Sequence, residues 1–168
     1  TSVAIAIMLA EISNKWVKKI TQSIVILPHF MSWTIVSMLS VAILSANGVV
    51  NQLITMVGGK TIEFYNTPSV WPAILVILKV WQGAGFGSIV YLATITGIDA
   101  SIYEAAAVDG ASKTQCIFKV TLPMLKNTII MLTIMSVGKI FNGDFGMIYA
   151  MVGSNSILYP TTDVIDTY

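Results

Sequence analysis

Residues 20–59 contain no Asp, Glu, Lys or Arg, and no other feature of the sequence constrains the fold as strongly as this uncharged run. A helix needs about 20 apolar residues to cross a hydrocarbon core roughly 30 Å thick. The run is therefore long enough for one membrane span followed by an uncharged loop. Because Asn47-Gly48 is a turn signal, we place the span at residues 23–46. Pro28 then lies in its first turns, where a helix tolerates proline best.

The composition points to a membrane protein throughout. Only 10% of the 168 residues are charged, whereas a soluble domain carries about a quarter, so the apolar excess must face lipid. The net charge is +1 and all nine basic residues are Lys, which argues against a nucleic-acid partner.

The sequence has few residues of the kinds that form catalytic centres or metal sites. The single cysteine, Cys116, excludes an intrachain disulfide and a Cys-rich metal site. The single histidine, His29, has no ligand cluster beside it, so we expect no metal. No phosphate-cradling GxxxxGK[ST] loop occurs, and no nucleophile–base pairing marks a catalytic centre. We expect this chain to bind no cofactor and to be no enzyme.

Three further apolar segments are expected in the membrane. Residues 1–10 are too short to cross it, and we expect them to be the end of a span in a larger subunit of which this chain is a part. Residues 71–97 open on a Trp-Pro pair, which suits both a membrane interface and a helix start. The last span is expected at residues 127–150.

We expect these segments to form one transmembrane domain over residues 1–168.

Gly83, Gly85 and Gly87 fall within one span, and small residues let helix backbones approach closely. This stripe should therefore face other helices and not lipid.

The lysines divide unequally between the two sides of the membrane. Crossing two spans returns the chain to its starting face, so residues 11–19 share a side with residues 98–126. That side carries Lys15, Lys18, Lys19, Lys113, Lys119 and Lys126, whereas the connections on the other side carry only Lys60. Because cytoplasmic loops are enriched in Lys and Arg, residues 98–126 are predicted to face the cytoplasm.

Residues 104–123 are the longest polar interval of the chain, and with their flanks they make up residues 98–126, whose first half is expected to form a short helix ending at Val108. Its start is either Asp99 as an N-cap or a capping box formed by Ser101 and Glu104. An alanine run gives the segment high helix propensity.

The second half of this interval begins with a sharp turn. Asp109-Gly110 should break the first helix, because Gly adopts the positive φ of a corner and Asp109 can cap the next helix. A second helix over residues 111–120 is expected to end at Leu122-Pro123. The prediction is a cytoplasmic helix–turn–helix elbow with a membrane span at each end, suited to passing motion between a soluble partner and the spans.

The elbow carries a recognisable pattern. Its matching residues are Glu104, Ala105, Ala106, Asp109, Gly110, Ala111, Phe118, Leu122 and Pro123. In order and spacing they resemble the EAA loop of ATP-binding-cassette (ABC) importer permeases. Matches over Leu27–Trp33, Gly97–Tyr103 and Asp163–Tyr168 resemble the permeases that carry oligo- and polysaccharides, so the resemblance covers nearly the whole chain.

The resemblance implies a fold and an assembly. The chain would be about three full spans, and the end of a preceding one, of a type I ABC importer permease core. It would be one of two homologous subunits in a bacterial cell membrane. Its elbow would dock as a coupling helix on a cytoplasmic ATPase dimer, which uses the ATP and Mg, and Glu104 would pair with a basic residue there. An extracytoplasmic binding protein would deliver the sugar.

Two lysines and one aspartate lie within the expected spans: Lys79, Lys139 and Asp144. Ionisable groups there are costly and usually face a cavity or a partner. They either contact sugar along a translocation path or form structural ion pairs. Lys139 and Asp144, five residues apart, are about 140° apart around a helix, so they would pair only across a break. Trp81 and Phe86 are candidates for stacking on sugar rings, although aromatic residues in spans more often pack or anchor the interface.

A different class of membrane protein remains as an alternative. An ion-coupled secondary transporter or channel could use Lys79, Lys139 and Asp144 for ion coupling, and an assembly factor would have no transport. Neither alternative gives the elbow a role.

Overall fold

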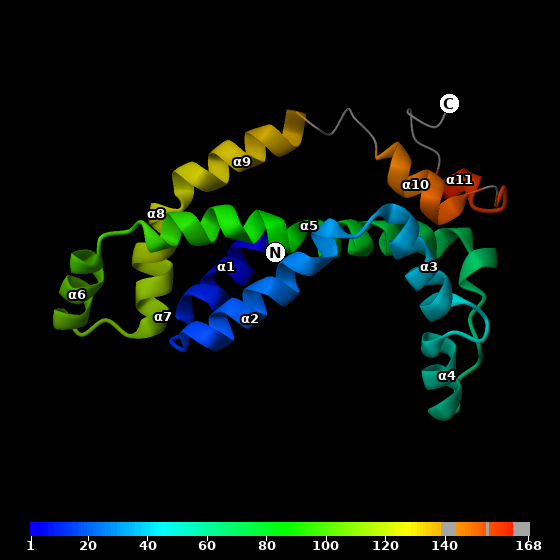
Figure 1. Ribbon diagram of the computed structural model, residues 1–168, viewed down its shortest axis with the longest axis horizontal. Helices are drawn as coiled ribbons and strands as arrows, with labels where there is room; N and C mark the ends of the chain where they lie inside the picture. Colours follow the sequence, from blue (N-terminus) through cyan, green and yellow to red (C-terminus); the bar gives the residue numbers. More distant parts are fainter. Residues whose placement is uncertain (139–143, 154, 163–168) are drawn as a thin grey trace. The chain divides into compact units, whose positions relative to one another are not determined.

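The computed structural model describes residues 1–138, 144–153 and 155–162, and every regular element in these ranges is a helix (Figure 1). The predicted all-α class is thereby confirmed. The chain divides into two compact units, one made of Thr1–His29 and Val80–Ile140 and the other of Phe30–Lys79 and Phe141–Tyr168. The long helix α5 (Trp71–Thr96) contributes residues to both.

The first unit has a core made by three helices. Its buried residues are Ala6 and Leu9 of α1 (Ser2–Glu11), Tyr91, Leu92 and Ile95 of α5, and Leu125, which precedes α9 (Lys126–Gly138). Ile129 and Leu132 of α9 pack against this core. The hydroxyl groups of Thr94 and Thr128, 3.2 Å apart, add a polar link between α5 and α9.

Helix α2 (Lys15–Ile26) approaches the backbone of α5 very closely at one glycine. A Cβ atom placed on Gly85 would lie 1.9 Å from the carbonyl oxygen of Val25, so any side chain there would force the backbones apart. A Cβ on Gly87 would meet Ser2 at 2.8 Å, whereas one on Gly83 would meet nothing within 4 Å. The expectation that this stripe faces other helices therefore holds for Gly85 and Gly87.

The second unit is built around α3 (Trp33–Leu44), the N-terminal half of α5 and α10 (Phe145–Val152). Its buried residues are Val36, Trp71, Leu75, Met147, Ile148, Met151, Val152 and Leu158. The Trp71 ring N–H donates a 2.9 Å hydrogen bond to the Phe64 carbonyl, in the short 3-10 helix η2 (Phe64–Asn66). Helix α4 (Val49–Met56), the 3-10 helix η3 (Pro68–Val70) and α11 (Tyr159–Thr162) complete the unit.

Two stretches of the described residues are long and apolar enough to cross a membrane: Trp33–Met56 and Pro68–Thr96. A third results if Lys113–Met124 and Lys126–Gly138, bent by 56°, count as one span. Several hydroxyl side chains in these helices bond to their own backbone, as when the Ser40 hydroxyl donates to the Val36 carbonyl at 2.8 Å and the Thr94 hydroxyl to the Val90 carbonyl at 3.1 Å.

The single helix expected over residues 23–46 is wrong, because the chain breaks at Pro28. Helix α2 ends at Ile26, the 3-10 helix η1 (Leu27–Phe30) follows, and α3 begins at Trp33. Proline has no N–H to continue the α-helical bonds, and its ring clashes with the preceding turn. The Ser32 side chain then accepts from the Ile35 N–H and starts the next helix.

Two further expected boundaries change. Helix α4 follows α3 after the Asn47-Gly48 turn and belongs to the same candidate span, so the connection expected from residue 47 begins after Met56. Residues 127–150 do not form one helix, because Asp144 has a non-helical backbone and is the N-cap of α10. The span expected at residues 71–97 agrees with α5.

Gly85→Ala in the full-length permease is expected to lower its melting temperature, because the added Cβ collides with the α2 backbone. Overpacking of this kind costs about 1–3 kcal/mol. Thermal unfolding in detergent, followed by size-exclusion chromatography, measures the effect. Gly83→Ala is the matched control, since its Cβ meets nothing within 4 Å. Equal melting temperatures for the two variants would contradict the close approach.

Candidate functional site

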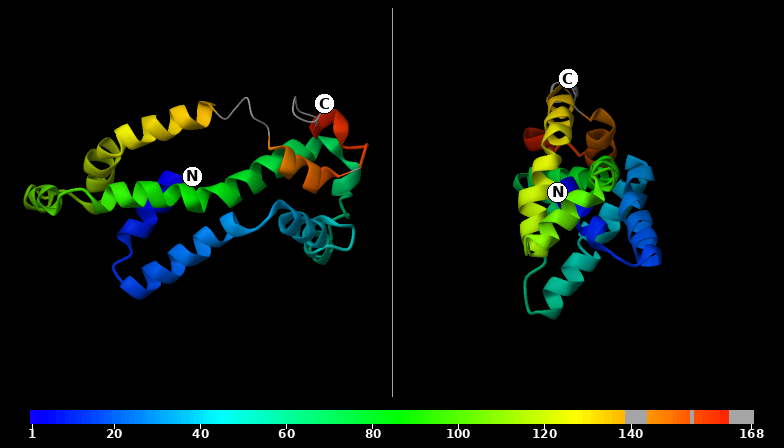
Figure 2. Two further views of the ribbon diagram at one scale, coloured as in Figure 1. Left: turned by 45° about the horizontal axis from the view of Figure 1, so that its top comes forward. Right: turned by 90° about the vertical axis from the view of Figure 1, so that its left-hand side faces the viewer.

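The elbow, residues 98–126, lies beyond the C-terminal end of α5, where α6 and α7 are drawn in yellow-green (Figures 1 and 2). Helix α6 (Ala100–Val108) begins at Asp99, whose carboxylate accepts a 2.9 Å hydrogen bond from the Ser101 N–H. Of the two predicted starts, the Asp99 cap is therefore confirmed, and Ser101 lies inside the helix. The same hydrogen bond, with one from the Ser101 side chain, lowers the pKa of Asp99 from its ordinary value.

The corner of the elbow has the predicted glycine geometry. Gly110 has φ +75°, a left-handed conformation that L side chains rarely adopt. The Ala111 N–H donates to the Ala106 carbonyl at 2.9 Å, which closes the end of α6. This bond, reaching five residues back, is typical of a glycine helix terminus.

The second half of the elbow differs from the prediction at both ends. Ser112, not Asp109, caps α7 (Lys113–Cys116), and a capping box joins Ser112 to Gln115. The Ser-x-x-Gln spacing that signals this cap was present in the sequence. The helical run continues through a π-helical segment, η4 (Ile117–Thr121), into α8 (Leu122–Met124), so Leu122-Pro123 does not end it.

The π-helical segment explains how the run passes Pro123. The Leu122 N–H donates to the Ile117 carbonyl, five residues back, so the hydrogen-bond register shifts just before the N–H that Pro123 lacks. The Tyr103 hydroxyl lies 2.9 Å from that of Thr121, a buried residue of the same segment. This bond ties α6 to the point where the run changes register, and no sequence signal predicted it.

The elbow has a cleft lined by residues of both its halves, and we call the exposed side chains outside this cleft its outer side. A cleft of about 350 Å³ is lined by Ala106, Asp109, Gly110, Ala111, Gln115, Cys116, Lys119 and Val120. Outside it, Glu104 and Ala105 are exposed to solvent, as are the large apolar side chains of Val108 (88%) and Phe118 (65%). A carboxylate beside uncovered apolar surface is a feature of protein-binding sites.

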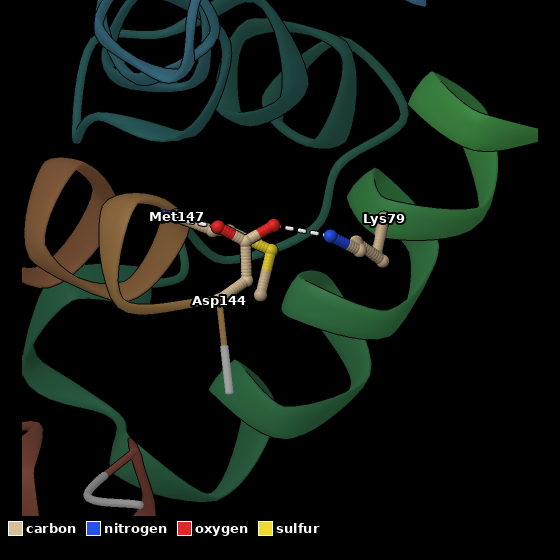
Figure 3. Close-up of polar contacts among 3 residues, drawn as sticks. All are labelled: Lys79, Asp144 and Met147. Atoms are coloured by element: carbon tan, nitrogen blue, oxygen red, sulfur yellow. Dashed lines mark hydrogen bonds and ion pairs between the residues drawn. The ribbon is translucent and has the colours of Figure 1, made fainter. Parts of the chain in front are cut away.

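The second unit brings Lys79 and Asp144 together as an ion pair (Figure 3). The Lys79 ammonium group binds Oδ2 of Asp144, while Oδ1 accepts a 3.2 Å hydrogen bond from the Met147 N–H at the start of α10. The ammonium nitrogen also lies 5.4 Å from the centre of the Trp33 ring, which permits a cation–π contact. Asp144 therefore joins α5 to α10. No spacing in the sequence singled out Trp33, which precedes Lys79 by 46 positions.

The remaining residues predicted along the translocation path are Trp81, Phe86 and Lys139. Trp81 and Phe86 belong to the first unit, where both are partly exposed. The Phe86 ring stacks on His29 with centroids 4.3 Å apart. Lys139 and the matching residues 163–168 lie outside the described residues.

Comparison with known families identifies the class of protein. The model of the family described as "Binding-protein-dependent transport system inner membrane component" matches residues 2–165. The chain belongs to this family, and the predicted resemblance is confirmed.

Two individual relatives within this family are named for the transport of saccharides. The chain is 34% identical over 167 residues to the polygalacturonan/rhamnogalacturonan transport system permease protein YteP of Bacillus subtilis, covering 99% of this chain and 51% of YteP. It is 36% identical over 118 residues to the lactose transport system permease protein LacF of Rhizobium radiobacter, covering 68% of this chain and 39% of LacF.

A solved structure supports the same assignment. A bacterial ABC transporter involved in the import of the acidic polysaccharide alginate matches with a TM-score of 0.92 and 39% identity. The match covers 99% of this chain and 58% of that one. The chain thus spans about half the length of curated relatives such as YteP.

The first turn of α6 is expected to open in acid. A carboxylate whose pKa is lowered on folding stabilises the fold above its ordinary pKa, and this contribution is lost as the pH falls through the lowered value. Amide protection at Ser101 and Ile102 should therefore decrease below the ordinary Asp99 value of 3.8. Asp99→Asn keeps a capping oxygen and should remove this pH dependence, as hydrogen-exchange protection factors would measure. An identical acid response in both proteins would refute the cap.

Gly110→Val is expected to distort the elbow, although a Cβ on Gly110 would meet no atom within 4 Å. The cause is the positive φ, which costs a β-branched residue about 1–2 kcal/mol or more. Gly110→Asn is the control, because Asn tolerates this conformation better. Limited proteolysis of the full-length permease should cut Gly110→Val faster than Gly110→Asn within residues 98–126. Equal cutting would show that the corner does not need its glycine.

Proposed function

We propose that this chain is part of a membrane-spanning subunit of an ATP-driven ABC importer for saccharides. The observation that carries the proposal is the elbow, a rigidly capped pair of short helices between apolar helices, with Glu104 and apolar side chains exposed. The family membership supports transport, and the names of the relatives support a carbohydrate substrate.

The proposed assembly has four kinds of component. Two homologous permease subunits form the path in a bacterial cell membrane, each crossing it several times. A cytoplasmic ATPase dimer binds ATP and Mg, and this chain catalyses no reaction of its own. An extracytoplasmic binding protein delivers the sugar, as the match to a transporter solved with an oligosaccharide-bound periplasmic protein supports.

The elbow passes the movement of the ATPase subunits to the membrane-spanning helices. Its outer side docks in a cleft of the ATPase subunit, where Glu104 pairs with a basic residue and Val108 and Phe118 bury apolar surface. The Tyr103–Thr121 bond joins α6 to the π-helical segment, so displacement of α6 reaches the 56° bend before α9. The lysine distribution supports a cytoplasmic location for this side.

Ion coupling has less support. Lys79 and Asp144 neutralise each other inside the second unit, so neither charge requires a transported ion to balance it.

Glu104→Ala is expected to leave the permease folded but to weaken its binding to the ATPase by about 1.5–3 kcal/mol, the range for a hydrogen bond to a charged group. ATP-driven uptake should fall with it. Co-purification of the ATPase and uptake into proteoliposomes measure the two effects. Glu11→Ala, at another exposed glutamate of the same unit, is the control. Unimpaired binding and uptake in Glu104→Ala would overturn the docking role.

A further inference from the structure

The side chain of Lys79 lies deep within a candidate span and is still 54% exposed. It is eight residues from Trp71, the first residue of α5, which is about 12 Å along the helix. An exposed ammonium group is costly in lipid at that depth, and such groups usually face a cavity or a partner. The exposed half of Lys79 is therefore expected to face a polar path or a polar partner.

The ion pair with Asp144 leaves the Lys79 ammonium group with N–H donors that can bind another acceptor. A lysine has three N–H donors, and among the described residues the side-chain acceptor that it reaches is Oδ2 of Asp144. The Trp33 ring covers another side at 5.4 Å, and this ring is itself only partly buried. Lys79 thus presents a cation beside an aromatic face.

Asp144 is held in place without Lys79. Its Oδ1 caps α10 through the Met147 N–H, and the carboxylate lies at the N-terminus of that helix, where the helix dipole favours a negative charge. The side chain is 28% exposed, so water reaches it. Another carboxylate can therefore replace Asp144 on Lys79 while Asp144 keeps its hydrogen bond and hydration.

We infer that Lys79 and Trp33 form a subsite for the carboxylate of a hexuronate saccharide, and that Asp144 holds the ammonium group until that carboxylate replaces it. A hexuronate combines the two features that this pair matches: an anion for the ammonium group and an apolar ring face for the indole. The exchange keeps the lysine charge paired at every stage, so transport never exposes a bare cation in the membrane. This inference rests on the proposed importer function and adds its substrate class.

The test is ATP-driven uptake by the complete importer in proteoliposomes, with its own binding protein. Trimers of galacturonate and of mannuronate are each compared with the carboxyl-reduced, neutral trimer of the same sugar. Because one binding protein serves every permease variant, its own preference cancels. A change in the acidic-to-neutral uptake ratio between variants therefore reports the permease.

Lys79→Gln should lower the acidic-to-neutral ratio about tenfold, the contribution of a hydrogen bond to a charged group, and keep neutral uptake. Asp144→Asn keeps the capping oxygen but removes the competing charge, so it should lower the KM for the acidic trimer. Lys60→Gln, at an exposed lysine of the same unit, should change neither quantity. If Lys79→Gln does not assemble, the Lys79→Gln/Asp144→Asn double variant, which leaves no unpaired charge, should show the same loss of ratio.

Other results would overturn the subsite. Equal losses of acidic and neutral uptake in these variants would show that the ion pair is structural only. An unchanged ratio would remove Lys79 from the path. A wild-type importer that carries neutral trimers with ATP but shows no preference for acidic ones would sink the subsite and leave the proposed function standing. Absence of ATP-driven uptake of every trimer would instead count against the proposed function itself.

Discussion

The hydrocarbon core of a membrane supplies no hydrogen-bond partners, and the rest of this structure depends on that constraint. Backbone groups are satisfied within helices, and hydroxyl groups such as that of Ser40 bond to their own helix. In the candidate span Pro68–Thr96 the ionised group is Lys79, and its ammonium group pairs with Asp144, which lies 65 residues further along the chain. The longest polar interval of the chain, residues 104–123, accordingly lies in the elbow, outside the candidate spans Trp33–Met56 and Pro68–Thr96.

The elbow combines two capped helices with one segment, Ile117–Thr121, where the regular α-helical hydrogen bonding is interrupted. Separate caps at Asp99 and Ser112 fix the two helices independently, and the positive φ of Gly110 fixes the angle between them. The π-helical segment Ile117–Thr121 and the bend after it interrupt the otherwise regular path toward α9. Segments of this kind often mark functional hinges, so motion entering at α6 has a place where it can be absorbed or passed on.

Local sequence signals predicted the features that local chemistry decides. The long helix α5, the Asp99 cap and the Gly110 corner follow from composition, capping and glycine geometry, and the structure has all three. The Ser112 cap had an equally local signal, but the prediction assigned this cap to Asp109. Pro28 divides the helix expected over residues 23–46, because proline interrupts hydrogen bonding even in an apolar run. The Tyr103–Thr121 bond and the grouping of Trp33, Lys79 and Asp144 depend on tertiary contacts, which no spacing along the chain reveals.

The central claim is that the outer side of the elbow meets the ATPase. Photocrosslinking in the complete importer tests it most directly, with a photoreactive amino acid at Val108 of the elbow or at Val57 after α4, which are 88% and 89% exposed. We expect Val108 to crosslink to the ATPase subunit, with a yield that changes when ATP is added, and Val57 not to crosslink. Crosslinking at both positions alike, or at neither, would contradict the claim.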